Sequence, residues 1–512
     1  MRASGILMPI FSLPSKYGIG TFSKEAMEFV DQLSTAGQKY WQVLPLGPTS
    51  YGDSPYQSFS SFAGNPYFID IDELHREGLL SQEELPEQQE LTEIKPQDDS
   101  LVMNENNRYI DYEKLYNTRY LILRKAYERF DKSEAAFQKF KIENEHWLKG
   151  YSSFMAIKNY YNDQEVSHWD KKLQLREKEA LEHMHSLCEN DICFYDFLQY
   201  KFMQQWDRLH KYANSKGIQI IGDIPIYVAL DSADCWCSPE LFQLDDELKP
   251  TAVAGCPPDP FAVTGQLWGN PLYKWEYHKS TNYEWWEQRI QHSFRLYDVV
   301  RIDHFRGFDE YYSIPYGDKT AEFGTWVKGP GIDLFHSLNN RLGKLNIIAE
   351  DLGFLTDSVI QLLHESGYPG MKILQFAFDS REENDYIPHT YPKNCVVYTG
   401  THDNDTVVGW INSISKEDRE YALNYMGVDK MHPDIQWDFI RLALQSIADV
   451  AIFPIHDLLG LGSEARINIP STLGNNWRWR MLSSELTPEI LAKLKKLTHL
   501  YGRTNNIGNE SK

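Results

Sequence analysis

The sequence predicts an α/β fold, a parallel (β/α)8 TIM barrel with largely helical subdomains inserted between its strands. Eight short, β-rich apolar runs recur along the 512 residues, and several of them end in Gly, Asp, Glu or His. Helical patterns lie between many of these runs. Strands that alternate with helices imply a parallel sheet, and eight strands are the number that closes such a sheet into a barrel. An open, doubly wound sheet would accommodate fewer of these runs.

The expected strands lie within residues 3–11, 40–46, 218–228, 297–305, 345–353, 370–378, 394–403 and 450–460. Apolar spacing predicts a helix around residues 26–33 that stops before Gly37, and another around residues 198–209 that stops before Gly217. A third helix should begin at Thr487-Pro488, a pair typical of an N-cap and the first helical position.

The intervals between the strands are unequal, which indicates insertions into a single domain. We expect residues 1–505 to form one catalytic barrel. Residues 72–215 are long, charged and largely helical, and are predicted to form an insertion between the second and third strands. Residues 231–296, rich in Pro, Gly and Trp, are predicted to form a second insertion that carries an active-site lid.

The composition restricts the class of ligand. The net charge of −22 argues against nucleic acid, because a phosphate backbone selects basic surfaces. The 31 Tyr, 25 Phe and 14 Trp suit a carbohydrate site, although most of these rings are expected in the core. There is no apolar run of about 18 residues to span a membrane. The N-terminus lacks the pattern of a signal peptide, so the cytoplasm is the expected location.

Polar residues follow the apolar runs at the predicted carboxyl ends of the strands, where barrel enzymes carry their catalytic groups. These residues are Asp223, Arg301, Asp303, His304, Glu350, Asp351, His402, Asp403 and His456. Strand side chains alternate, so Arg301 and Asp303 should share a face, and the guanidinium should lower the pKa of Asp303. A structural Arg–Asp ion pair at the barrel mouth is the alternative.

Glu350 follows an apolar run, and partly apolar surroundings should raise its pKa enough for general acid catalysis near neutral pH. His402 and Asp403 are placed to bind substrate hydroxyls. A metal site is the rival interpretation, but the sequence has no i, i+4 His pair and no HExxH motif. It also lacks a GxSxG elbow, and residues 265–270 do not match a dinucleotide fingerprint. Paired carboxylates at strand ends are typical of glycoside bond transfer.

Several long motifs resemble the 4-α-glucanotransferases called amylomaltase or disproportionating enzyme, glycoside hydrolase family 77. The matching stretches run nearly end to end. They are residues 51–72, 222–236, 255–275, 300–308 (VRIDHFRGF), 347–353 (IIAEDLG), 374–379, 399–406 (TGTHDNDT) and 463–480. The insertion at residues 72–215 carries little of the resemblance beyond its placement.

The resemblance implies that Asp303 is the nucleophile, Glu350 the acid/base and Asp403 the third carboxylate, which binds hydroxyls of the donor sugar. Arg301 and His402 are implied as their supports. The implied substrate-binding positions are Tyr56, Asp223, Trp268, Asn270, Asn468 and Pro470. Phe261 follows Pro260 in the lid segment and is expected to stack on a sugar near the cleavage point.

The function implied is retaining transfer of α-1,4-glucan segments from a maltooligosaccharide to glucose or another glucan, with no metal and no cofactor. An α-amylase-like hydrolase is one alternative, because it differs only in how the glycosyl-enzyme divides between sugar and water. A non-catalytic barrel that binds starch or glycogen is another. The expected partners are α-1,4-glucans, maltooligosaccharides and glucose, not nucleic acid or a membrane.

Overall fold

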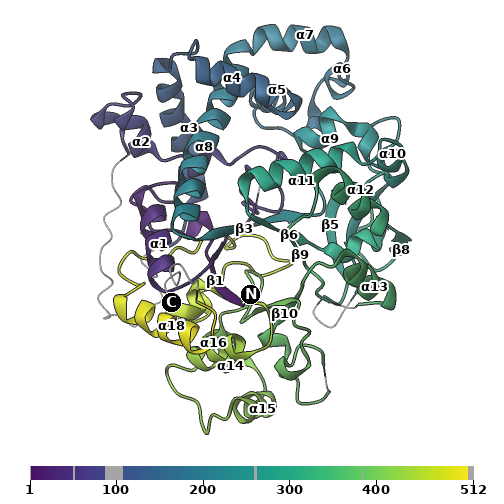
Figure 1. The fold of residues 1–512 in the computed structure, drawn as a ribbon. Helices are drawn as coiled ribbons and strands as arrows, with labels where there is room; N and C mark the ends of the chain where they lie inside the picture. The colour runs from purple at the N-terminus through teal and green to yellow at the C-terminus, as the bar shows by residue number, and fades with distance from the viewer. Residues whose placement is uncertain are drawn as a thin grey trace.

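Eight parallel strands form the centre of the molecule (Figure 1). The computed structural model describes residues 2–49, 52–86, 108–258, 262–353, 355–382 and 384–504. The central strands are β1 (Ala3–Leu7), β2 (Tyr40–Gln42), β3 (Gln219–Pro225), β6 (Val299–Asp303), β9 (Ile347–Ala349), β10 (Gly370–Ile373), β11 (Cys395–Tyr398) and β12 (Val450–Pro454). Each lies inside one of the eight runs, so the predicted barrel is confirmed.

The strands follow one another around the barrel in chain order, and β12 pairs with β1. Between β9 and β10 the barrel is joined by two contacts outside regular pairing. The N–H of Ala349 donates to the carbonyl of Pro369 at 3.0 Å. The N–H of Met371 donates to Oδ1 of Asp351 at 2.6 Å. A side chain at the end of β9 therefore takes the place of one backbone acceptor.

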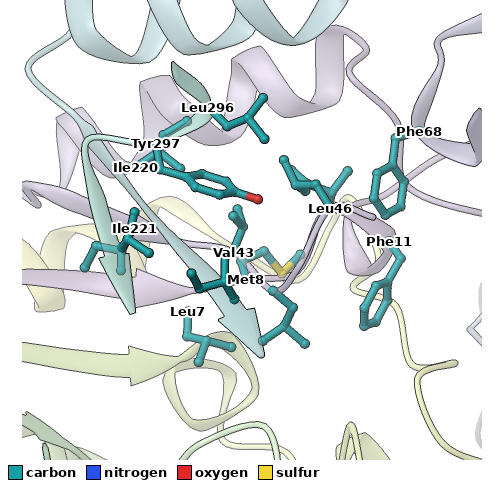
Figure 2. Packing of buried hydrophobic residues seen from close by; sticks show 14 of the residues in the cluster. Leu7, Met8, Phe11, Val43, Leu46, Phe68, Ile220, Ile221, Leu296 and Tyr297 are labelled. Carbon is teal, nitrogen blue, oxygen red and sulfur yellow. The ribbon is translucent and has the colours of Figure 1, made fainter. Parts of the chain in front are cut away.

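Strands β1 and β2 lie close together beside the core, and this close approach requires a glycine on β1. At Gly5 a Cβ atom would lie 2.4 Å from the carbonyl oxygen of Tyr40, its partner on the parallel strand β2, so only glycine fits here. Figure 2 shows the apolar side chains that fill this region, among them Leu7, Val43 and Ile221. Burial of such side chains contributes about 1.5–3 kcal/mol each.

The three predicted helices are present. They are α1 (Lys24–Thr35), α8 (Glu189–Ser215) and α18 (Pro488–Leu500). The residues that α1 buries are the four at helical spacing, Ala26, Phe29, Val30 and Leu33. In α18, Oγ1 of Thr487 accepts the N–H of Ile490, which confirms the predicted N-cap.

Further helices lie between the barrel strands. From β2 to β3 the chain forms α2 (Ile71–Arg76), α3 (Tyr112–Arg129), α4 (Ala135–Glu143), α5 (Glu145–Tyr160), α6 (Lys171–Gln174), α7 (Lys178–Leu187) and α8. Helices α3 to α7 lie to one side of the barrel, and α8 runs from this group down to β3 (Figure 1). The later helices are α9 (Ala233–Cys237), α10 (Trp275–Ser280), α11 (Glu284–Leu296), α12 (Ile332–Leu342), α13 (Asp357–Ser366), α14 (Val407–Ser413), α15 (Lys416–Met426), α16 (Gln436–Gln445) and α17 (Ile455–Leu459).

A second, antiparallel sheet was not predicted from the sequence. It consists of β4 (Ala252–Cys256), β5 (Gln266–Pro271), β7 (Glu310–Pro315) and β8 (Thr325–Lys328), in the order β5-β4-β7-β8. All four residues of β8 are exposed, and β5 contains Gly and ends in Pro, so neither has the alternating apolar pattern of a half-buried strand. The sheet joins β4 and β5, which precede β6 in the sequence, to β7 and β8, which follow it.

Two further observations concern the predicted class of protein. Among the described residues, no helix is both long enough and apolar enough to cross a membrane. All six cysteines lie within the described part of the chain and are free thiols.

Candidate active site

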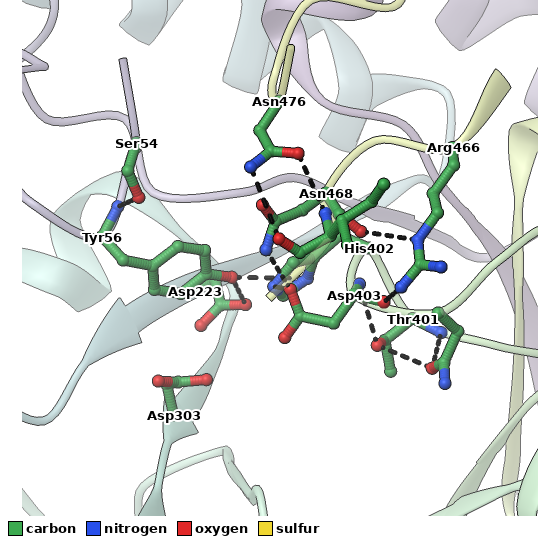
Figure 3. A network of polar contacts seen from close by, with 12 residues as sticks. Ser54, Tyr56, Asp223, Asp303, Thr401, His402, Asp403, Arg466, Asn468 and Asn476 are labelled. Carbon is green, nitrogen blue, oxygen red and sulfur yellow. Dashed lines mark hydrogen bonds and ion pairs between the residues drawn. The ribbon is translucent and has the colours of Figure 1, made fainter. Parts of the chain in front are cut away.

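The three expected catalytic carboxylates come together at the carboxyl ends of the barrel strands. Asp303 is the last residue of β6, and Glu350 directly follows β9. Asp403 lies in the segment between β11 and α14. Figure 3 shows Asp303 below Asp223 and Tyr56, and Asp403 to their right. Carboxylates that lie between residues 303 and 403 of the sequence are thus neighbours because all parallel strands end at one rim.

Arg301 joins two carboxylates below this site. Its Nη1 lies 2.6 Å from Oδ2 of Asp223 and 3.1 Å from Oδ1 of Asp303. Arg301 acts to lower the pKa of Asp303, as predicted, but the net pKa is nevertheless above the ordinary value. Burial raises the pKa of Asp303 to about 6, and the opposing effect of Arg301 is weaker. The guanidinium is shared with Asp223, whose negative charge itself raises the pKa of Asp303.

Glu350 has the raised pKa that the sequence predicted. Its Oε2 accepts the N–H of His304 at 2.6 Å, and its Oε1 accepts the N–H of Leu352 at 3.0 Å. Both bonds favour the ionised form. Burial and the nearby charge of Asp303 outweigh them, and raise the pKa of Glu350 to about 7. A substantial fraction of this carboxyl is therefore protonated at neutral pH.

Asp403, in contrast to Glu350, is kept ionised by its neighbours. Its Oδ1 accepts Nδ2–H of Asn468 at 2.6 Å and lies 3.3 Å from Nε2 of His402. Burial acts to raise its pKa, but His402 and Asn468 together lower it to about 2. The same pairing raises the pKa of His402 against the effect of burial. The Asp403 side chain is 46% exposed, so an ionised carboxylate faces the open side of the site.

Tyr56 forms a wall of the site next to these groups. Its hydroxyl donates to Oδ2 of Asp223 at 2.9 Å and lies 3.4 Å from Nδ1 of His402. Its ring stacks on His402 with centroids 5.0 Å apart. The pKa of Tyr56 is raised well above its ordinary value, first by burial and then by Asp223, so the hydroxyl remains a donor. The Tyr56 side chain is half-buried, and the apolar face of a sugar can pack against a ring of this kind.

The remaining expected substrate-binding residues differ in accessibility. The side chain of Asp223 is fully buried, so in this structure it holds Arg301 and Tyr56. Asn270 is also buried and donates from Nδ2 to the carbonyl of Val228 at 2.7 Å. Trp268 is half-buried, with its ring 4.8 Å from that of His304 in an edge-to-face contact. Pro470 is exposed. Phe261 lies outside the described residues.

Arg466 and Trp477 lie near the carboxylates but were not predicted as part of the site, and His304 was expected at the strand ends without a role. Arg466 donates from Nη2 to the carbonyl of Asp403 at 2.6 Å and from Nε to that of Asn468 at 2.8 Å. The ring of Trp477 lies 5.8 Å from that of Tyr56. His304 contributes its backbone N–H. Their positions in the sequence could have indicated these residues, because Arg466 and Trp477 share the 463–480 motif with Asn468, and His304 follows Asp303.

A large cavity lies beside the site, but none of the three carboxylates lines it. It has a volume of about 1450 Å³, and one of its lining residues, Gln57, follows Tyr56 in the chain. Its aromatic lining comes from Phe59, Tyr67, Tyr112, Tyr116, Tyr120, Phe194, Tyr195, Trp236 and Tyr316. A cavity of this size and composition could accommodate several sugar units, and the three expected catalytic carboxylates lie outside it.

The chemical capacity of the site follows from its protonation states. Near neutral pH, Glu350 can give up a proton, whereas Asp403 is ionised and Asp303 is mostly ionised. Carboxyls whose surroundings separate their pKa values in this way can divide acid and nucleophilic roles. Among the described residues, no three His, Cys, Asp or Glu side chains are grouped as metal ligands.

Comparisons with known proteins agree with this geometry. The family model described as 4-alpha-glucanotransferase matches residues 8–486. A 4-alpha-glucanotransferase of Clostridium butyricum is 49% identical over 499 residues, covering 97% of this chain and all of the relative. One from Thermus thermophilus is 42% identical, covering 97% and 98% of the two chains. The solved amylomaltase of Streptococcus agalactiae in complex with acarbose is 42% identical, with a TM-score of 0.92 and coverage of 99% and 100%.

Proposed function

Because the chain belongs to the 4-alpha-glucanotransferase family, we propose that it transfers α-1,4-glucan segments from a donor maltooligosaccharide to glucose or another glucan, with Asp303, Glu350 and Asp403 as its catalytic groups. The observation that supports these roles is the contrast in protonation at one barrel rim. Glu350 has a pKa of about 7, and Asp403 has a pKa of about 2. One carboxyl is suited to give and take a proton, and the other to remain negative beside developing positive charge.

In the first step, Glu350 donates its proton to the glycosidic oxygen while a carboxylate oxygen of Asp303 attacks the anomeric carbon. The bond from that carbon to the glycosidic oxygen breaks, and the reducing-end fragment leaves as a neutral sugar. The donor segment stays bound to Asp303 as a covalent ester. Asp403 binds hydroxyls of the donor sugar, and its negative charge stabilises the oxocarbenium-like transition state.

In the second step, Glu350 is a carboxylate and takes the proton of the acceptor's 4-hydroxyl. The acceptor oxygen attacks the anomeric carbon and displaces Asp303, so the configuration is retained after two inversions. This mechanism predicts that the carboxyls of Asp303 and Glu350 lie about 5–5.5 Å apart when a glucan is bound. No cofactor takes part in either step.

Transfer rather than hydrolysis requires that a sugar reach the intermediate before water does. The ring of Tyr56 beside His402, and the edge-to-face pair of Trp268 and His304, provide aromatic surfaces next to the carboxylates. We propose that a glucan chain continues past Gln57 into the aromatic cavity. Holding an acceptor sugar on such surfaces displaces water from the reacting centre.

Incubation with maltotriose tests this function. Transfer yields glucose together with a ladder of longer maltooligosaccharides, and the same chain carrying Asp303→Asn serves as the blank. Glucose and maltose alone would identify an α-amylase-like hydrolase. A glucan-binding barrel without activity would bind maltooligosaccharides in calorimetry and release no product.

A further inference from the structure

A buried carboxyl near the site has no part in the proposed chemistry. Asp457 lies on α17, directly after β12, and its side chain has no solvent exposure. Among the described residues, no Lys or Arg forms an ion pair with it, and burial raises the pKa of Asp457 to about 7. The adjacent His456 has Nε2 3.7 Å from Oδ1 of Asp457, but burial lowers the pKa of His456 to about 3 and leaves it neutral. A carboxyl buried without a counter-charge is costly unless its hydrogen bonds are satisfied.

The carboxyl of Asp457 holds the two ends of one chain segment. Its Oδ2 accepts Oγ1–H of Thr399 at 2.6 Å, and its Oδ1 accepts the backbone N–H of Val407 at 2.7 Å. Thr399 is the first residue after β11, and Val407 is the first residue of α14. Both ends of the segment 399–407 are therefore hydrogen-bonded to the same side chain, that of Asp457.

This segment carries His402 and Asp403. Its outer part is tied to the rest of the molecule at other points, because Arg466 donates to the carbonyl of Asp403 and Nε2 of Gln375 donates to the carbonyl of Asp405 at 2.7 Å. Those contacts act on the tip of the segment. Asp457 acts at its base, where a small displacement of either end moves every residue between them.

We propose that Asp457 is a positioning residue for glucan transfer, and that its carboxyl fixes Asp403 and His402 in the site by holding Thr399 and Val407 together. The proposal rests on the proposed role of Asp403 in binding the donor sugar. Asp457 touches no substrate, so its effect passes through the geometry of the segment. Preorganised carboxylates are sensitive to such support, because a misplacement of 1 Å can cost about 10²-fold in rate.

Three substitutions separate the contacts. Thr399→Val keeps the shape of the side chain and removes one donor. Asp457→Asn keeps both bonds if its Nδ2 donates to the Thr399 hydroxyl while its Oδ1 accepts the N–H of Val407. Asp457→Leu removes both. Thr498→Val is the matched control, because Oγ1 of Thr498 is buried on the outer helix α18 and bonds to the carbonyl of Leu494 at 2.9 Å.

The measurements are kcat and KM with maltoheptaose, with active sites counted from the calorimetric stoichiometry of acarbose. We expect kcat per active site to fall about tenfold in Thr399→Val and about 10²-fold in Asp457→Leu, and to stay within about threefold in Asp457→Asn and Thr498→Val. KM should stay within about twofold, because the remote sugars of the chain keep their contacts. If Asp457→Leu fails to fold, the kcat of Thr399→Val still tests whether Asp457 is a positioning residue.

A double-mutant cycle on acarbose affinity identifies the route of the effect. In the Asp403→Asn background, Thr399→Val should cost little further affinity, because the group that it misplaces is already gone. Three outcomes would each overturn the positioning role. They are a parental kcat in Thr399→Val, full additivity in the cycle, and an Asp457→Asn enzyme that is as impaired as Asp457→Leu. Asp403→Asn with near-parental activity would instead contradict the proposed function itself.

Discussion

The backbone N–H of His304 donates a 2.6 Å hydrogen bond to Oε2 of Glu350. The residue after the proposed nucleophile is therefore bonded to the proposed acid/base. His304 adopts a left-handed conformation with φ 54° and ψ 46°, which is uncommon outside glycine and turns the chain at the end of β6. Such strain is found where the surrounding structure enforces it, and here it ties Glu350 to the turn that follows Asp303.

Asp303→Asn should abolish turnover and leave the fold intact. An amide cannot form the glycosyl ester, so the loss should exceed the roughly 10²–10⁴-fold typical of one acid–base group. Release of glucose from maltotriose measures turnover, and the melting temperature reports the fold. The surface variant Asp429→Asn is the matched control. Activity of Asp303→Asn within about tenfold of the parent would exclude the nucleophilic role.

The pH profile of kcat/KM should be bell-shaped. The acid limb reflects Asp303, which must be ionised and has a pKa of about 6, so activity falls as pH drops below that value. The alkaline limb reflects Glu350, which must be protonated and has a pKa of about 7, so activity falls as pH rises above it. A profile that stays flat from pH 7 to about pH 9 would contradict Glu350 as the acid.

Glu350→Gln should lose activity on maltotriose and recover much of its first step with α-maltosyl fluoride, because fluoride leaves without a proton. The alkaline limb should also disappear, since glutamine does not titrate. Fluoride release measures this first step. Asp303→Asn serves as the control, because the fluoride donor still needs a nucleophile. Equal rescue of both variants would contradict the division of roles between the two carboxyls.

Arg301→Gln should move the acid limb to higher pH. The guanidinium acts to lower the pKa of Asp303, so its loss should raise that pKa further and leave less of the ionised form near pH 6. It also leaves Asp223 buried without its cation, and removing one partner of such a pair costs about 3–5 kcal/mol of stability.

Arg301→Lys is the matched comparison for this prediction, because it keeps the positive charge but not the planar fork of donors. Its acid limb should shift less than that of Arg301→Gln. Equal shifts in the two variants would show that charge is not the cause. The melting temperatures of both variants should be compared at one pH.

Tyr56→Phe should lower kcat/KM by about ten- to 10²-fold, the cost of one lost hydrogen bond to the Asp223 carboxylate. The ring that stacks on His402 stays in place, so the melting temperature should change little. Tyr56→Ala should cost more, because the aromatic surface is lost as well. The control is Tyr109→Phe, whose hydroxyl bonds to the carbonyl of Glu464 at 2.9 Å. Equal activity of Tyr56→Phe and Tyr56→Ala would contradict the stacking role.

The barrel could be predicted because each of its parts leaves a local pattern. Residues 297–305 are apolar and β-rich before they reach Asp303, and α1 places its four buried residues at helical spacing. The small sheet left no such pattern. Strand β8 is wholly exposed and pairs with β7, so only its hydrogen-bonding partner makes it a strand. Pairing between segments separated along the chain is not encoded in local periodicity.

The candidate site divides in the same way. The motifs around Asp303, Glu350 and Asp403 were legible in the sequence, and the raised pKa of Glu350 was predicted from its apolar neighbours. The pKa of Asp303 was not. Arg301 is two residues before Asp303 in the sequence, yet its Nη1 lies closer to the carboxylate of Asp223 on β3 than to that of Asp303. No local pattern could indicate this.

The sequence by itself determined the strands and the helical faces, because these depend on the spacing and type of neighbouring residues. It also contained the motifs around Asp303, Glu350 and Asp403, whose resemblance to a known family implies their roles. Only the tertiary structure decided which charges meet. It brought Asp457 from the end of β12 to both ends of the segment that carries Asp403, and Arg466 to the carbonyl of Asp403. Electrostatic and hydrogen-bond energies depend on distance in space and on burial, and both are known only once the barrel has closed.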